Sequence, residues 1–165
     1  MEAYEVVVVP LKSKNDDASQ WAWVSLTATG IEHVYTGIEG VLKTLVNEVD
    51  GGVHAKEEYH KALLAQCLVE TTERPAILDQ VTHALVDELR GFRHAERNNY
   101  IDALRAHEVD DNYKRMNAAM PAFRSDVLKF IEEMSTRYTA EAEAAAAADS
   151  EDDSPGDGPS TPGLR

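Results

Sequence analysis

Three arginines and a histidine near the middle of the chain are spaced to share one face of a helix. Arg90, Arg93, His94 and Arg97 fall at positions i, i+3, i+4 and i+7, which lie above one another on a helix surface. Like charges at this spacing repel, so the cluster needs carboxylate partners or an anion such as phosphate, whose oxygens fit the guanidinium fork. The spacing therefore predicts either a phosphate site or a charged surface neutralised by the acids around it.

The composition limits what this arginine cluster can bind. The 165-residue chain has a net charge of −14, so it lacks the general polyanion affinity of a basic protein, and any RNA contact is expected to be local. The single cysteine, Cys67, excludes an intramolecular disulfide and favours a reducing compartment. No apolar run is long enough for a membrane span and no signal-peptide pattern is present, so we expect a cytoplasmic protein.

The apolar spacing predicts an all-α fold, an antiparallel bundle of four to five helices with short connections. The longest pattern begins at Trp21 and ends before Gly51, a residue suited to a left-handed helix cap. Three glycines inside that pattern predict close helix packing or a local break. Further helices are expected over residues 55–69, from Pro75 to about 97, over 109–120 and, after a restart at Pro121, over 123–138.

These patterns divide the chain into three parts. Residues 1–20 form an arm in which Val6 to Val9 have strand propensity and Pro10 interrupts them, so an edge strand and an irregular segment both remain open. Residues 21–140 form the helical domain. In residues 141–165 an alanine run extends the last helix, and serine, proline, glycine and acids then predict disorder.

Motifs for bound cofactors are absent from the sequence. There is no glycine-rich phosphate loop, no paired-cysteine zinc spacing, no His-Glu-x-x-His and no Gly-x-Ser-x-Gly. No i, i+4 histidine pair with a carboxylate is present, so we expect neither a metal nor a cofactor. His33 and His60 lie beside apolar helix faces in the pattern, and we expect both to pack there.

Three segments carry a resemblance to a known family. His33 to Leu42 resembles the His-x-x-Tyr-Thr-Gly-Ile-Glu helix of HepT-like proteins, which belong to the HEPN superfamily. Tyr59 to Leu64 is similar to their aromatic-His-x-x-Leu-Leu element. Leu89 to Tyr100 resembles their Arg-x4-His-x-Tyr signature. The resemblance covers roughly residues 20–135.

This resemblance implies a function. It implies an all-helical toxin of a toxin–antitoxin pair, usually a homodimer, that acts as a metal-independent endoribonuclease. The implied partner is a small MNT nucleotidyltransferase, which neutralises the toxin by adenylylating the motif tyrosine. Carried over residue by residue, the motif arginine is Arg93, the modified tyrosine is Tyr100, and the position of the motif histidine holds Asn98.

Asn98 changes the chemistry that this signature can perform. RNA cleavage through the 2′-hydroxyl needs one group to accept a proton and one to return it, and an amide does not titrate near neutrality as imidazole does. We expect His94 to take the acid–base role, Arg90, Arg93 and Arg97 to bind the scissile phosphate, and Asn98 to orient it. The alternative is a catalytically impaired helical module that binds a nucleotidyltransferase partner or a nucleotide without cleaving RNA.

Overall fold

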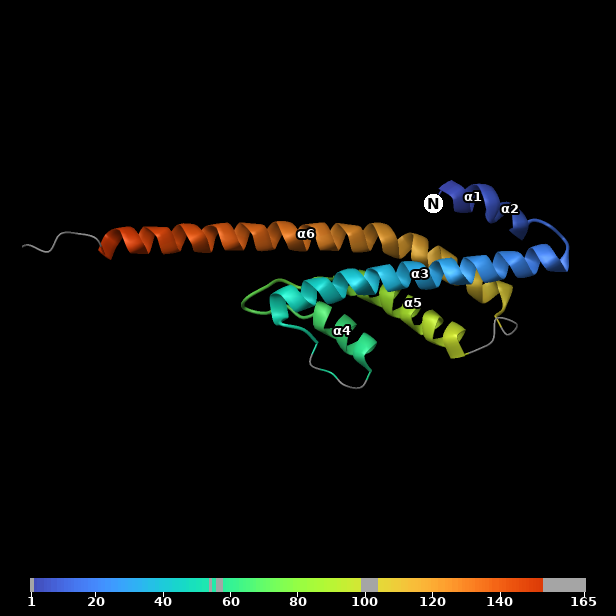
Figure 1. The fold of residues 1–165 in the computed structure, drawn as a ribbon, viewed down its shortest axis with the longest axis horizontal. Helices are drawn as coiled ribbons and strands as arrows, with labels where there is room; N and C mark the ends of the chain where they lie inside the picture. Colours follow the sequence, from blue (N-terminus) through green and yellow to red (C-terminus); the bar gives the residue numbers. More distant parts are fainter. Residues whose placement is uncertain (1, 54, 56–57, 99–103, 153–165) are drawn as a thin grey trace, which may run out of the picture.

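The computed structural model describes residues 2–53, 55, 58–98 and 104–152, all of whose regular elements are helices. These are α1 (Glu2–Val7), α2 (Val9–Lys12), α3 (Asp17–Asp50), α4 (Tyr59–Cys67), α5 (Gln80–Asn98) and α6 (Ala106–Asp152). In Figure 1, α3 and α6 run along the long axis, α4 and α5 lie on one side of them, and α1 and α2 lie beside the N-terminal end of α3. The predicted all-α bundle is confirmed.

Helix α3 is the centre of the bundle, because it contacts α4, α5 and α6. Its first turn is capped by Asp16, whose carboxylate accepts a hydrogen bond from the backbone N–H of Ser19 at 2.8 Å. Its last turn ends at Gly51 with φ of 71°, the left-handed cap that the sequence predicts. Residues on one face are buried at the spacing of the sequence pattern: Val24, Ala28, Ile31, Tyr35, Ile38, Leu42 and Val46.

The glycines of α3 neither break the helix nor let another helix approach closely. Helix α3 is continuous through Gly30, Gly37 and Gly40. A Cβ atom built on each of them would meet no heavy atom within 4 Å among the described residues. The expectation of a break or of close packing at these positions is therefore wrong for this part of the chain.

We expect Gly37→Ala to raise the free energy of unfolding by about 0.5–1 kcal/mol, because alanine loses less backbone entropy in a helix and here meets no neighbour. Gly51→Ala provides the contrast, because the φ of 71° at Gly51 is strained for alanine and should cost about 1–2 kcal/mol. Urea unfolding of both variants measures the two changes. A loss of stability in Gly37→Ala would contradict the open surface at this position.

Helix α5 begins later than the sequence predicts. It starts at Gln80 rather than in a first turn at Pro75, and Ile77 and Leu78 are buried in the preceding non-helical segment. The cause is Asp79, whose carboxylate accepts a hydrogen bond from the backbone N–H of Thr82 at 2.7 Å. The apolar spacing of the sequence also predicts Val81 in the core, but this residue is 68% exposed, whereas Leu89 and Phe92 of the same helix are buried.

Helix α6 replaces two predicted helices. It runs without interruption through Pro121, although proline inside a helix costs about 3 kcal/mol. Buried residues on both sides of the proline, Ala119 and Phe123 among them, offset this cost by packing into the core. The helix continues to Asp152, and so includes the alanine run and the first residues of the segment 141–165. None of the described helices is long and apolar enough to span a membrane.

The first residues are helical rather than a strand or an irregular arm. Tyr4 of α1 stacks on Tyr113 of α6 with ring centroids 5.1 Å apart, and its hydroxyl lies 2.8 Å from the hydroxyl oxygen of Thr27. Val8, between α1 and α2, is buried. Contacts with distant residues therefore outweigh the strand propensity of the valine run.

Arg74 joins the end of α3 to the segment after α4. Its side chain is 2% exposed, and its guanidinium donates two hydrogen bonds to the Asp50 carboxylate, at 2.6 and 2.7 Å. The remaining donors bond the carbonyl oxygens of Gln66, Val69 and Pro75 at 2.8–3.1 Å. Hydrogen bonding from Arg74 holds the pKa of Asp50 below its usual range. The contact fixes where α4 lies against α3.

Helix α4 is shorter than the predicted span of residues 55–69. It covers nine residues and buries Leu63, Leu64 and Cys67, so the single cysteine is a core residue. Burial raises the pKa of the Cys67 thiol to about 12, so the thiol stays protonated and unreactive at neutral pH. The residue before α4, Glu58, has φ of 51°. The short helix brings its first turn next to α5.

Candidate functional site

Arg90 and His94 lie one helical turn apart on α5 and line a common pocket of about 280 Å³. The other lining residues, Glu58, His60 and Lys61, come from the start of α4. The pocket thus gathers two imidazoles, two permanent cations and one carboxylate. The Nε atom of Arg90 donates a hydrogen bond to the Asp87 carboxylate at 2.7 Å, which raises the pKa of Arg90 above its ordinary value. Arg90 therefore stays charged.

Arg93 points toward α3 instead of into this pocket. Its side chain is 13% exposed, and its Nε lies 3.8 Å from a carboxylate oxygen of Glu32. The guanidinium carbon lies 5.7 Å from the centre of the Tyr35 ring, within reach of a cation–π contact. The buried Nε makes no hydrogen bond within the described residues. The motif arginine is therefore held between α3 and α5 by charge and ring contacts.

The Tyr35 ring that contacts Arg93 is uncharged. Its side chain is buried, and burial is the main cause that raises the pKa of its hydroxyl far above the ordinary value. The nearby Glu39 raises this pKa further, while the positive charges of Arg90 and Arg93 lower it in part. The phenol consequently carries no charge near neutral pH.

His60 is tied to α3 by a carboxylate. Its Nδ1 atom contacts the Glu39 side chain, which is 14% exposed. The ring of Tyr59 meets that of His60 edge-on, with centroids 5.7 Å apart. The His60 side chain is 47% exposed, and His33 is also exposed. The expectation that both histidines pack against apolar helix faces is therefore wrong, because each lies beside the buried face of its helix rather than on it.

The structure brings together part of the predicted arginine cluster. Arg90 and His94 share the pocket, whereas Arg93 faces α3. The side chains of Arg97 and Asn98, and all of Tyr100, fall outside the described residues. His60 and Lys61 of the pocket were not among the predicted site residues. The signal that could have indicated them is the aromatic-His-x-x-Leu-Leu element, which places both at the start of a helix.

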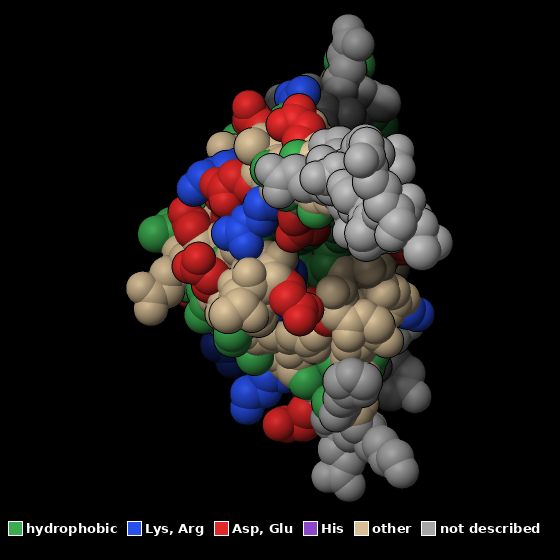
Figure 2. All heavy atoms as spheres, turned by 90° about the vertical axis from the view of Figure 1, so that its left-hand side faces the viewer, with side chains coloured by type: hydrophobic (Ala, Val, Ile, Leu, Met, Phe, Trp, Pro, Cys, Tyr) green, Lys and Arg blue, Asp and Glu red, His purple; other side chains and the backbone are tan. Residues whose placement is uncertain are grey.

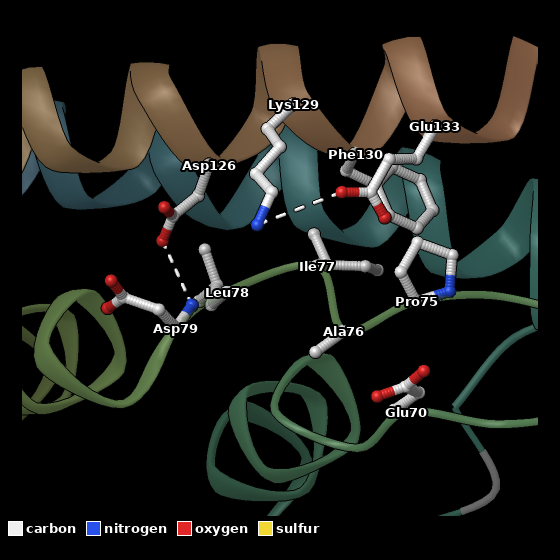
Figure 3. A pocket seen from close by; sticks show the side chains of 10 residues that line it. All are labelled: Glu70, Pro75, Ala76, Ile77, Leu78, Asp79, Asp126, Lys129, Phe130 and Glu133. Carbon is white, nitrogen blue, oxygen red and sulfur yellow. Dashed lines mark hydrogen bonds and ion pairs between the residues drawn. The ribbon is translucent and has the colours of Figure 1, made fainter. Parts of the chain in front are cut away.

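A second pocket, between α6 and the segment that precedes α5, has the opposite charge. It has a volume of about 220 Å³ and is lined by ten residues, including Glu70, Asp79, Asp126 and Glu133. Figure 3 shows its lysine, Lys129, directed at Glu133, with 3.7 Å between the ammonium nitrogen and the carboxylate. Uncompensated carboxylates repel phosphate, so this pocket does not suit a nucleic-acid backbone.

The surface at one end of the molecule is of mixed charge. Figure 2 shows acidic and basic side chains next to one another on this face, with apolar side chains between them. Such a surface gives no long-range attraction for a polyanion. The pocket between α4 and α5 remains the best candidate for an anion site in the described part of the chain. Within that part, no group of three or more His, Cys, Asp or Glu residues is arranged to hold a metal ion.

Comparison with known proteins adds one finding. Residues 26–134 match the model of a protein family described as "HepT-like protein". No curated protein and no solved structure matches the chain. The matched span includes most of α3, all of α4 and α5, and α6 as far as Met134. Both walls of the pocket therefore lie inside it, while α1, α2 and the end of α6 lie outside.

Proposed function

Because the chain belongs to the HepT-like family of the HEPN superfamily, we propose that it is the toxin of a toxin–antitoxin pair and a metal-independent endoribonuclease. The observation that carries this proposal is the pocket in which Arg90 and His94 of α5 face His60 and Lys61 of α4. Two cations can bind a phosphodiester there while an imidazole moves a proton. These are the groups that cleavage through the 2′-hydroxyl requires.

The signature residues take the following roles in this proposal. Arg90 and Arg97 bind the RNA backbone, and Arg93 opposes the negative charge that develops on the scissile phosphate. His94 transfers a proton, and Asn98 orients the phosphate through its amide. In the structure Arg93 lies over Tyr35 and near Glu32. To stabilise the phosphate, the guanidinium must either turn outward and contact it or act at a distance through its positive charge.

The proposed partner is an MNT-type nucleotidyltransferase antitoxin that neutralises the toxin by adenylylating Tyr100. Association of the family with toxin–antitoxin pairs supports this assignment. We further propose that the chain acts as a homodimer in the cytoplasm. Tyr100 follows Arg97 by three residues in the sequence, and the phosphodiester charge that adenylylation adds would compete with RNA for the arginines.

A second candidate is the catalytically impaired helical module, which binds the nucleotidyltransferase or its nucleotide without cleaving RNA. Two observations favour it: Asn98 occupies the position of the motif histidine, and Arg93 faces α3 rather than the pocket. This candidate predicts a stable complex with the nucleotidyltransferase and no RNA cleavage by the free chain.

We expect the purified chain to cleave single-stranded RNA in EDTA, and Arg93→Ala and His94→Ala each to slow cleavage about 100-fold. Loss of an electrostatic stabiliser or of a general acid–base group has an effect of roughly this size. The initial rate on an end-labelled oligonucleotide measures it, and circular dichroism verifies the fold. Arg124→Ala, an exposed arginine of α6, is the matched control. A wild-type chain that leaves the RNA intact in EDTA, as Arg93→Ala does, would reject the nuclease in favour of the binding module.

A further inference from the structure

We propose that His60, held by Glu39, is a second proton-transfer group of the pocket and acts as the general base opposite His94. This inference rests on the proposed ribonuclease function and assigns a residue that the arginine signature does not contain. It also supplies what Asn98 lacks, because two titratable imidazoles are then present without a histidine at the motif position.

The contact with Glu39 determines which nitrogen of His60 is available. An ionised carboxylate only accepts hydrogen bonds, so the Nδ1 atom that contacts it must carry the proton and donate. In the neutral ring, Nε2 then has the free lone pair. Catalytic histidines are held in the correct tautomer by a carboxylate that accepts from one ring nitrogen. The other ring nitrogen then accepts the proton of the substrate. Glu39 is thus a positioning residue, and His60 the catalytic one.

The surroundings of His60 suit a phosphodiester. The charged and titratable groups that face it are Glu39 from α3, Glu58, Tyr59 and Lys61 from α4, and Arg90 and His94 from α5. Lys61 and Arg90 can bind the phosphate oxygens, and the two histidines come from opposite walls. A pocket of about 280 Å³ lies at the lower end of the range of ligand sites. It has room for one phosphodiester linkage of a strand.

The reaction balances with these two groups. His60 Nε2 accepts the proton of the ribose 2′-hydroxyl, while the 2′-oxygen forms a bond to phosphorus. The bond from phosphorus to the 5′-oxygen breaks, and protonated His94 gives its proton to that oxygen. The products are a 2′,3′-cyclic phosphate and a 5′-hydroxyl, with one proton gained by His60 and one lost by His94. No oxidant, reductant or metal ion takes part in these steps.

A purely structural role for His60, as a clamp between α3 and α4, gives different results from a catalytic one. In His60→Gln the side-chain amide can still donate to Glu39 but cannot titrate. We expect this variant and His60→Ala to lose about 100-fold to 10,000-fold in kcat with little change in KM. His33→Gln, at an exposed histidine of α3, is the matched control and should retain wild-type kcat. Glu39→Gln should lose less than His60→Gln, because it keeps an acceptor for Nδ1.

Two further measurements separate catalysis from folding. A general base must be unprotonated, so wild-type kcat should rise with pH along an acidic limb, and His60→Gln should lose that limb. Added imidazole should restore part of the activity of His60→Ala but not raise that of wild type. Circular dichroism verifies that each variant is folded, and His60→Gln carries the test if His60→Ala is not.

The outcomes are distinguishable. If wild type cleaves a single-stranded RNA oligonucleotide in EDTA and His60→Gln is as active as His33→Gln, the inference is overturned and the ribonuclease function stands. If wild type cleaves no RNA, the proposed function fails and the inference fails with it. Loss of kcat with an unchanged pH profile and no imidazole rescue would assign His60 to the clamp and overturn its role as a base.

Discussion

We expect Asn98→His to cleave RNA about 100-fold faster than the wild-type chain, because the substitution restores an imidazole at the motif position. Asn98 is the last residue of α5 and follows His94 by four residues, so both fall on one face of that helix. An amide cannot exchange a proton near neutral pH, whereas imidazole does so readily. General acid–base assistance contributes about 100-fold to 10,000-fold to a rate. We expect a gain at the lower end of this range because the pocket already contains two histidines.

The initial rate of oligonucleotide cleavage in EDTA measures this gain, and growth inhibition after expression in cells gives a second reading. Asn117→His is the control, because it adds a histidine at an exposed position of α6. A rate for Asn98→His equal to that of the control would mean that His60 and His94 already provide all the proton transfer that the reaction uses. If Asn98→His raises the cleavage rate of the otherwise wild-type chain but not of the His60→Gln variant, positions 60 and 98 act in the same reaction.

Asp50→Ala should lower the free energy of unfolding by about 3–5 kcal/mol, the usual consequence of removing one partner of a buried ion pair. The remaining Arg74 would be 2% exposed in the present fold and would lack the acceptor of two of its hydrogen bonds. Because small domains have a total stability of about 5–15 kcal/mol, the variant should be only marginally folded. Urea unfolding followed by circular dichroism measures the change. Glu48→Ala, at an exposed acid of the same helix end, should change stability by less than about 0.5 kcal/mol.

The same ion pair gives a pH dependence of known sign. The pKa of Asp50 is lower in the folded chain than its ordinary value, so its contribution is complete above the unfolded pKa of about 3.9 and is lost as the pH falls through the folded pKa. The stability difference between wild type and Asp50→Ala should therefore shrink below about pH 4. A difference that stays constant to lower pH would assign the effect of the substitution to packing rather than to the charge.

A helix was predictable from the sequence where residues within the helix itself determine its formation and its ends. Helix α3 follows from apolar residues at steps of three and four and from Gly51 at its end. The start of α5 depends in part on a local cap, because the Asp79 carboxylate accepts from the backbone N–H of Thr82. The position of Asp79 itself depends on a distant residue, because its backbone N–H donates to the carboxylate of Asp126, 47 residues away on α6. Continuity of α6 through Pro121 likewise depends on core contacts on both sides of the proline. Such contacts between distant residues are not contained in local periodicity.

The candidate site divides in the same way. That Arg90 and His94 share a face follows from their spacing on one helix. The direction of Arg93 was not predictable, because it depends on the positions of Glu32 and Tyr35 on α3. His60 was assigned to an apolar face because its neighbours in α4 are apolar, yet its partner Glu39 lies 21 residues earlier. A histidine whose carboxylate comes from another helix cannot be told from a packing histidine by sequence spacing alone.

The length of α6 bears on how the number of subunits is to be measured. With 47 residues and a rise of 1.5 Å each, the helix extends over about 70 Å. A compact domain with the number of residues of this chain has a radius of gyration of only about 15 Å, so the helix is longer than such a domain is wide. An elongated particle diffuses more slowly than a sphere of equal mass, so a single chain would elute from a gel-filtration column earlier than a compact protein of the same mass. Light scattering or sedimentation equilibrium, which report mass independently of shape, are therefore the methods that can count the chains.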